Sequence, residues 1–202
     1  MARLTVPCGR LDRMTTKEGA SMTAEQHATT PQAATGEHAD LLAALAKQRH
    51  FLRFTTRDLT DEQAGAAPTA SALCVGGLIK HVTSVERAWA RFLVEGASAM
   101  PDFTKMTEAD WEKRADNFRM LPGETLAGVL DAYAKAADDT DELLASLPDL
   151  GADQPLPPAP WFEPGTRWSA RRVVLHLIAE IAQHAGHADI IRETLDGQKS
   201  MG

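Results

Sequence analysis

The sequence predicts an all-α protein: an up-down bundle of four helices preceded by a flexible N-terminal extension. Apolar residues recur at spacings of three and four in four long stretches between residues 37 and 197, which is the period of a helix with one buried face. No stretch is predicted to be a strand, and no internal repeat is visible. Four such helices in one chain can pack side by side and build a site from their facing side chains.

Composition limits the classes of protein to consider. The 202 residues are 44% hydrophobic, which suits one domain with a real core. Acidic residues outnumber lysine and arginine by 28 to 21, giving a net charge of −7, so neither nucleic acid nor an anionic membrane is expected as a partner. No apolar run approaches the roughly 20 residues that span a bilayer.

Cysteine usage points to a reducing compartment. Cys8 and Cys74 are the two cysteines, and they form no Cys-x-x-Cys pair, so neither a disulfide framework nor a thiolate zinc site is indicated. A cytoplasmic location is therefore expected.

Residues 1–36 are predicted to be a disordered extension, and residues 37–202 the folded domain. Thr, Ala, Gln and Gly dominate the extension, and no apolar period is sustained. Its first residues are basic but lack the apolar centre of a secretory signal. Met14 and Met22 offer later starts, so the first twenty or so residues are expected to be dispensable.

The first helix of the predicted bundle runs from about Glu37 to Arg57. A break follows, and Thr60 is predicted to cap a short helical turn, with Gln63 three residues later completing a capping box. The apolar positions of the first helix are Leu41, Leu42, Leu45, Phe51, Leu52 and Phe54.

The second helix is predicted from about Val75 to Glu95, with Gly96 as its C-terminal cap. His81 falls on the apolar face of this helix. A single histidine in such a position is more often a hydrogen-bonded core residue than a metal ligand, so its significance depends on a partner elsewhere. The apolar residues of this face are Leu78, Val82, Val85, Trp89 and Phe92.

The middle of the chain is predicted to hold a short helix from Met106 to Phe118 and a third long helix from Glu124 to Leu147. Pro122 and Gly123 separate the two. The acidic run at 138–142 is spread around the third helix, so it predicts a solvated face in preference to a metal cluster.

A proline-rich loop, residues 148–167, precedes the last helix. Trp161 lies in this loop and Trp168 directly follows it. These two tryptophans are the candidates for binding a cofactor or substrate at the mouth of the bundle. Anchoring of the loop to the core is the simpler alternative for aromatic residues in such a loop.

The last helix, capped by Ser169 and ended by Gly197, carries the most informative pattern. His184 lies at the centre of its apolar stripe, and Glu180, His187 and His176 lie within about 80° of it on one side. A carboxylate near an apolar face is costly to bury unless it is paired or bound to a metal. Each histidine alone fits a polar shoulder facing water, but four potential ligands along one edge favour a site.

Together, His81, Glu180 and His184 form a predicted metal site. Residues four apart stack one turn above the other, so Glu180 and His184 can reach a common point. Two imidazoles and one carboxylate leave a coordination position open, as in catalytic sites. This donor set suits zinc, and nickel, iron or manganese would also be accepted.

Two segments resemble the DinB-like four-helix proteins, particularly their actinobacterial branch: LCVGGLIKHVTSVERAWARFLVEG and HLIAEIAQHAGHADIIRETLDG. The resemblance covers residues 37–197 and implies that His81, Glu180 and His184 bind a divalent metal. Many relatives have histidine at the position of Glu180, whereas the mycothiol-dependent maleylpyruvate isomerase branch has a carboxylate. His187 occupies a position that implies a role beside the ligands or on the substrate side.

The resemblance implies an enzyme that activates a low-molecular-weight, mycothiol-like thiol as cosubstrate for S-transfer or isomerisation. A cation stabilises thiolate, and His187 is the candidate catalytic residue that accepts its proton. Alternatives are a metal-hydroxide hydrolase and a non-catalytic metal- or ligand-binding stress protein. The expected partners are a small thiol and an electrophile, with neither nucleic acid nor membrane. A homodimer is kept as a candidate assembly.

Overall fold

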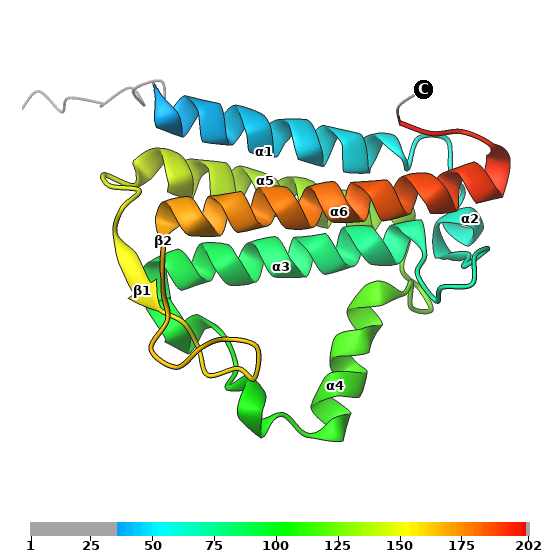
Figure 1. Ribbon diagram of the computed structural model, residues 1–202. Coiled ribbons are helices and arrows are strands. Elements are labelled where there is room, and N and C mark those ends of the chain that lie inside the picture. The colour runs from blue at the N-terminus through cyan, green and yellow to red at the C-terminus, as the bar shows by residue number, and fades with distance from the viewer. Residues whose placement is uncertain (1–35, 201–202) are drawn as a thin grey trace, which may run out of the picture. The chain divides into compact units, whose positions relative to one another are not determined.

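The computed structural model describes residues 36–200, and the predictions made for residues 1–35 lie outside this range. Four long helices build the domain (Figure 1), so the all-α bundle is confirmed. These helices are α1 (Glu37–Phe54), α3 (Val75–Glu95), α5 (Leu126–Ser146) and α6 (Ala170–Asp196).

The four helices do not simply alternate in direction. Figure 1 shows α1 and α6 running one way and α3 and α5 running the other. Ion pairs agree with this arrangement: Lys80 near the start of α3 contacts Glu124 just before α5, at 2.6 Å, and Arg171 at the start of α6 contacts Glu37 at the start of α1. The order is therefore up, down, down, up, because the connection from 96 to 125 returns the chain to the end where α3 began.

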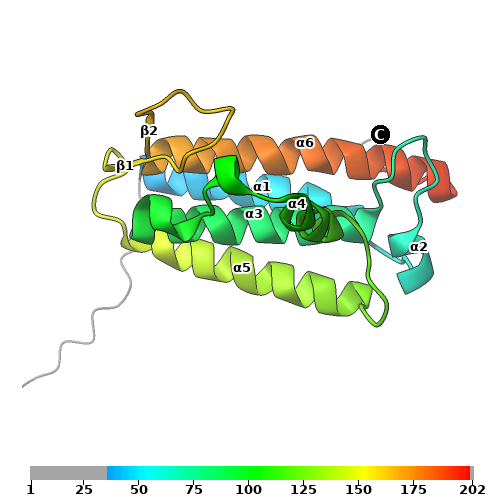
Figure 2. The same ribbon diagram turned by 90° about the horizontal axis from the view of Figure 1, so that it is seen from below.

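Short elements occupy the connections. α2 (Asp61–Gly65) follows α1, and between α3 and α5 the chain forms the 3₁₀ turn η1 (Gly96–Ala99), the turn η2 (Phe103–Lys105), α4 (Glu108–Ala115) and the turn η3 (Asp116–Phe118). Figure 1 shows this connection and the one from 148 to 169 on the same side of the bundle, and Figure 2 shows the second of them beside the start of α6.

One small sheet departs from the prediction of no strands. β1 (Asp153–Pro155) pairs antiparallel with β2 (Arg167–Ser169), and Gln154 is opposite Trp168. Strands of three residues are too short to show an alternating pattern in the sequence, which explains why the sequence analysis missed them. The pairing brings both ends of the proline-rich loop together.

Local signals in the sequence fix the helix ends as predicted. Thr60 and Gln63 form the capping box of α2, and the Ser169 hydroxyl accepts a hydrogen bond from the Arg172 amide at the start of α6. Gly96 and Gly197 end α3 and α6 with positive φ angles of 65° and 77°, a conformation that glycine adopts without a steric penalty.

A glycine in the first turn of α3 allows a close approach that shapes the site. A Cβ at Gly77 would lie 2.0 Å from the carbonyl oxygen of Phe118, so a larger residue would push the 96–125 connection away from α3. Lys80 binds the same segment through the carbonyl oxygens of Asp116 and Arg119, at 3.1 and 2.9 Å. The end of the connection is therefore held against the helix that carries His81.

The core between the four helices also contains one buried ion pair. Arg49 on α1 donates to Glu86 on α3, and both side chains are almost fully shielded from solvent. Arg49 also donates to Asp141 at 2.8 Å. The rest of the acidic run, Asp138, Asp139 and Glu142, is exposed, in agreement with the predicted solvated face. Across residues 36–200, no helix combines the length and apolar character needed to cross a membrane.

Candidate functional site

The site lies where α3 packs against α6. Leu78 and Val82 on α3 and Leu177 and Ile181 on α6 are buried in the core. Their burial fixes the rotation of both helices and directs neighbouring polar positions toward each other. In this way, His81 from α3 meets the 180–184 turn of α6.

His81, Glu180 and His184 form the one group in the described part of the chain whose ligand atoms could hold a metal ion. One ligand atom from each residue lies within 4.8 Å of the others. The three residues of the predicted metal site are thus brought together by two helices that are about 100 residues apart in sequence. We refer to this cluster as the candidate metal centre.

Glu180 is the central residue of a short row on α6. Its Oε2 lies 3.3 Å from Nε2 of His184, and its Oε1 lies 3.7 Å from Nε2 of His176. Because these residues are spaced by four, each is one helical turn from the next. His176, whose role the sequence left undefined, therefore belongs to the same row.

The protonation states of His81 on α3 and Glu180 on α6 suit cation binding. Burial lowers the pKa of His81 to about 4, and the nearby His184 and Arg114 act in the same direction, so the His81 imidazole is neutral at pH 7. The hydrogen bond with His184 lowers the pKa of Glu180, which is therefore ionised. Neutral imidazole and ionised carboxylate are the forms in which these side chains bind metals.

The spacing of the three donors also fits one ion. Two atoms bound to the same zinc ion at about 2.1 Å can be no more than about 4.2 Å apart. The 4.8 Å limit of the cluster is slightly larger, so small side-chain rotations would bring the donors to bonding distance. Two imidazoles and a carboxylate would leave room for a further ligand.

The structure places His187 on the far side of His184. The Nδ1 atoms of the two rings are 3.5 Å apart, whereas the Nε2 atom of His184 faces Glu180. His187 does not line the cavity beside the centre. Its predicted catalytic role stays a prediction, and its observed contact is with a ring nitrogen of a candidate ligand.

A cavity of about 360 Å³ opens beside the candidate metal centre, and His81, His176 and Glu180 are in its wall. We call it the aromatic cavity, because five aromatic side chains from both connections and from α3 line it. These rings belong to Trp89, Phe103, Trp161, Phe162 and Trp168.

The two predicted tryptophans both line the aromatic cavity but differ in their surroundings. Trp168 stacks on Trp89, with ring centroids 4.8 Å apart and planes inclined by 12°, and it contacts His176 edge to face. Trp161 is 54% exposed and touches Phe103. Trp168 therefore anchors the loop to the bundle while forming part of the wall, whereas Trp161 forms the outer rim.

Phe118 and Arg114 are among the residues of the site that sequence reasoning missed. Phe118 stacks on His81 with ring centroids 4.0 Å apart, and Arg114 lines the aromatic cavity. Both are in the 96–125 connection, whose path depends on the close approach at Gly77. The paired glycines at the start of the second predicted helix were the available signal.

Comparison with known proteins identifies relatives of both the sequence and the fold. The family model described as mycothiol-S-transferase matches residues 40–197. A crystal structure of a conserved protein from Enterococcus faecalis superposes with a TM-score of 0.58 at 15% identity, covering 82% of this chain and 100% of the other. At that identity the likeness shows the fold alone. Comparison with curated proteins gave no match.

Proposed function

Because the chain belongs to the mycothiol-S-transferase family, we propose that it joins mycothiol, or a similar low-molecular-weight thiol, to an electrophile with the help of a divalent cation. The observation that supports this function best is the cluster of His81, Glu180 and His184, two members of which, His81 and Glu180, line the aromatic cavity. The cluster offers a cation an incomplete set of ligands where a small molecule can enter.

Zinc is the cation we propose, since imidazole and carboxylate donors suit it, and nickel, iron or manganese would also fit this donor set. A cation held by His81, Glu180 and His184 would supply the positive charge that favours thiolate over thiol. Glu180 contributes the one negative charge of the three donors and thereby moderates the charge of the site.

We assign proton acceptance to His176 in preference to His187. His176 lines the aromatic cavity, and burial lowers its pKa, so its ring is neutral and able to accept the proton of an incoming thiol. His187 instead contacts Nδ1 of His184, a position suited to orienting that ring. In the reaction, the thiolate sulfur forms a bond to the electrophilic carbon, and the leaving group departs from that carbon with its electron pair.

The walls of the cavity suit an apolar or aromatic electrophile. Trp89 and Trp168 form a rigid stacked pair on one side, and the exposed Trp161 forms part of the rim. Aromatic walls bind flat, apolar groups through burial and ring contacts.

The test is turnover of 1-chloro-2,4-dinitrobenzene by the zinc-loaded full-length protein with and without mycothiol. The expected product is the dinitrophenyl thioether, formed only when zinc and thiol are both present, with chloride released. A His176→Gln variant should keep its zinc and lose about 10²-fold or more in turnover. A His50→Ala variant, which changes an exposed histidine of α1, should match the wild type.

Two other outcomes would replace the proposal. Hydrolysis of an ester substrate without thiol would indicate that the centre activates water, as in a metal-hydroxide hydrolase. Zinc and thiol binding without turnover of any electrophile would indicate a binding protein.

A further inference from the structure

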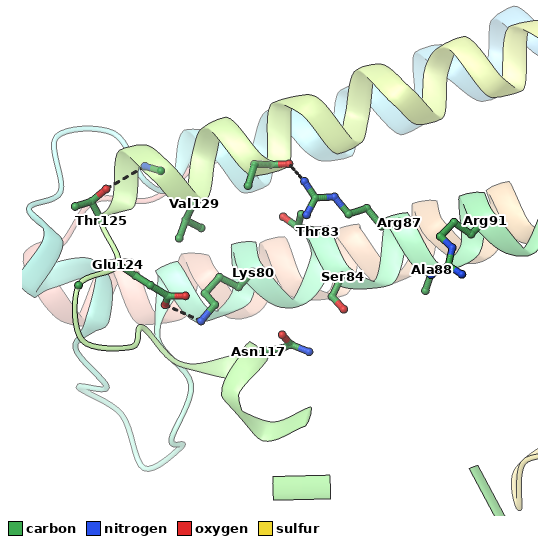
Figure 3. Close-up of a pocket in the computed structure, with 13 residues that line it drawn as sticks. Lys80, Thr83, Ser84, Arg87, Ala88, Arg91, Asn117, Glu124, Thr125 and Val129 are labelled. Carbon is green, nitrogen blue, oxygen red and sulfur yellow. Dashed lines mark hydrogen bonds and ion pairs between the residues drawn. The ribbon is translucent and has the colours of Figure 1, made fainter. Parts of the chain in front are cut away.

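A second cavity, which we call the polar groove, lies between α3 and α5. Its volume is about 640 Å³, larger than the aromatic cavity and within the range typical of ligand sites. Figure 3 shows Lys80, Ser84, Arg87 and Arg91 along α3, with Asn117 of η3 at one side. None of the candidate metal ligands lines this groove.

The polar groove adjoins the aromatic cavity. Ser84, Ala88 and Asn117 line both spaces, and Figure 3 shows Ser84 directed toward Asn117. Ser84 follows His81 by three residues, which is about one helical turn. A molecule with one end beside the candidate metal centre can therefore extend past Ser84 and Asn117 into the groove.

The groove presents hydrogen-bond donors and acceptors that the protein already holds in place. The Lys80 ammonium pairs with Glu124 at 2.6 Å, and the Arg87 guanidinium donates to the Ala132 carbonyl at 2.9 Å (Figure 3). Arg91 pairs with Glu95 at 2.9 Å. Because these cations have partners, the groove is less suited to a free anion than three basic residues alone would suggest.

A hydroxyl group both donates and accepts hydrogen bonds, so a polyhydroxylated ligand matches this mixture best. The amide of Asn117 can also do both, and the structure gives its side chain no hydrogen-bond partner within the described chain. By contrast, five tryptophan and phenylalanine side chains line the neighbouring cavity. The two spaces thus differ in the chemistry of the ligand that each would accept.

We propose that the polar groove binds the polyhydroxylated body of the thiol cosubstrate, while the thiol reaches past Ser84 and Asn117 to the aromatic cavity. Mycothiol carries its cysteinyl thiol on an amino sugar joined to inositol, and this body is uncharged and rich in hydroxyls. The inference rests on the proposed function and adds a division of the site: polar groove for the thiol body, aromatic walls for the electrophile.

The experiment measures binding of a sulfur-free probe, N-acetylglucosaminyl-inositol, to the zinc-loaded full-length protein by calorimetry. Arg87→Met and Asn117→Leu should each weaken binding about tenfold, the loss expected when one or two hydrogen bonds are removed. Arg53→Met is the matched control, because Arg53 is an exposed arginine on α1 outside the groove. Melting temperatures show which variants remain folded. If one groove variant does not fold, the other still tests the inference.

Three results would overturn the inference. In the first, the probe does not bind. In the second, the wild type and both groove variants bind it equally well. In the third, only Trp161→Ala weakens binding, which would place the sugar in the aromatic cavity. Inorganic phosphate that binds more tightly than the probe, and loses affinity in Arg87→Met, would make the groove an anion site.

Kinetics separate this inference from the proposed function. With mycothiol, Arg87→Met should raise KM about tenfold and leave kcat within twofold, whereas with N-acetylcysteine, which lacks the sugar and inositol, the variant should equal the wild type. Zinc-dependent transfer with the same KM for both thiols would support the proposed function and refute the binding of the thiol body in the polar groove. Probe binding in the groove without any transfer would do the reverse.

Discussion

Two glutamates inside the bundle illustrate how the same side chain serves different ends. Glu86 on α3 is fully buried and paired with Arg49, and burial raises its pKa although Arg49 acts against the shift. Glu180 on α6 keeps 28% of its side chain exposed, and its neighbours are His176 and His184. The first carboxylate is satisfied by the protein itself, whereas the second has oxygen atoms to offer a further partner.

The difference shows what distinguishes a structural charge from a site. A buried charge that is paired with an opposite charge cannot bind a further partner. Removing either member of the pair leaves the other charge buried and unpaired in a low-dielectric interior. A carboxylate beside imidazoles, at the edge of a cavity, has capacity for a cation. Perturbation of the first should therefore change folding, and perturbation of the second should change binding.

The largest expected effect comes from Arg49→Met. It leaves the Glu86 carboxyl buried without its partner, so the free energy of unfolding should fall by about 3–5 kcal/mol, measured by urea denaturation. Arg53→Met should stay within about 0.5 kcal/mol of the wild type. A loss below about 1 kcal/mol in Arg49→Met would show that water or another group satisfies the Glu86 carboxyl without Arg49. Arg49→Met combined with Glu86→Leu should recover most of the loss.

Glu180→Ala should weaken zinc binding strongly and change the stability of the protein little. Loss of one of three proposed ligands should weaken zinc binding by about 100-fold or more, measured by competition with a chromogenic chelator. The metal-free protein should lose less than about 1 kcal/mol of stability, because the side chain is partly exposed. His50→Ala is the control for zinc binding. Unchanged zinc affinity in Glu180→Ala would remove this residue from the candidate metal centre.

The pH dependence of stability in metal-free protein should be intermediate in size. His81 binds a proton below about pH 6.5 in the unfolded chain but only below about pH 4 in the folded one, so acid favours unfolding between these values. Stability should fall by about 1–2 kcal/mol across this window after allowance for partial exposure. Urea midpoints measured with chelator present test this, and His81→Phe should reduce the slope without abolishing it, because the lowered pKa of His176 acts in the same direction. The lowered pKa of Glu180 changes the stability only when the pH falls below about 4.5, the pKa of this carboxyl in the unfolded chain.

The smallest expected effect is that of His187→Ala. Its ring is 3.5 Å from His184, a long contact, so its loss should weaken zinc binding by no more than about tenfold and leave kcat within a few fold. The same chelator competition and the thioether assay give both values. A large loss of kcat with zinc binding intact would return His187 to the role of proton acceptor that the sequence suggested.

Features set by local sequence were predictable, and the helices are the main example. Periodicity located all four long helices, and hydrogen-bonding side chains identified the caps at Thr60 and Ser169. The cluster of His81, Glu180 and His184 was also foreseeable, because two of its members are four residues apart on one helix. His81 meets the other two residues once the amphipathic faces of α3 and α6 pack against each other.

Features set by the path of the connections were not predictable. Phe118 reaches His81 because the chain passes Gly77 at a distance that only glycine allows, and no periodicity records such a contact. The parallel course of α3 and α5 follows from the path of the 96–125 connection. The ion pair of Arg49 and Glu86 was not predicted, because each is an ordinary charged residue in its own helix. Only the packing of the four helices brings the two side chains together.

The aromatic cavity takes His81 and Glu180 of the candidate metal centre from α3 and α6 but much of its wall from two connections, residues 96–125 and 148–169. Loops tolerate insertion, deletion and substitution far better than packed helices do. A protein built this way can evolve toward new electrophiles by changing Phe103, Trp161 or the length of either connection while His81, Glu180 and His184 stay fixed. Under the proposed function, the reaction would then depend on the two helices, and the choice of electrophile would depend on the two connections.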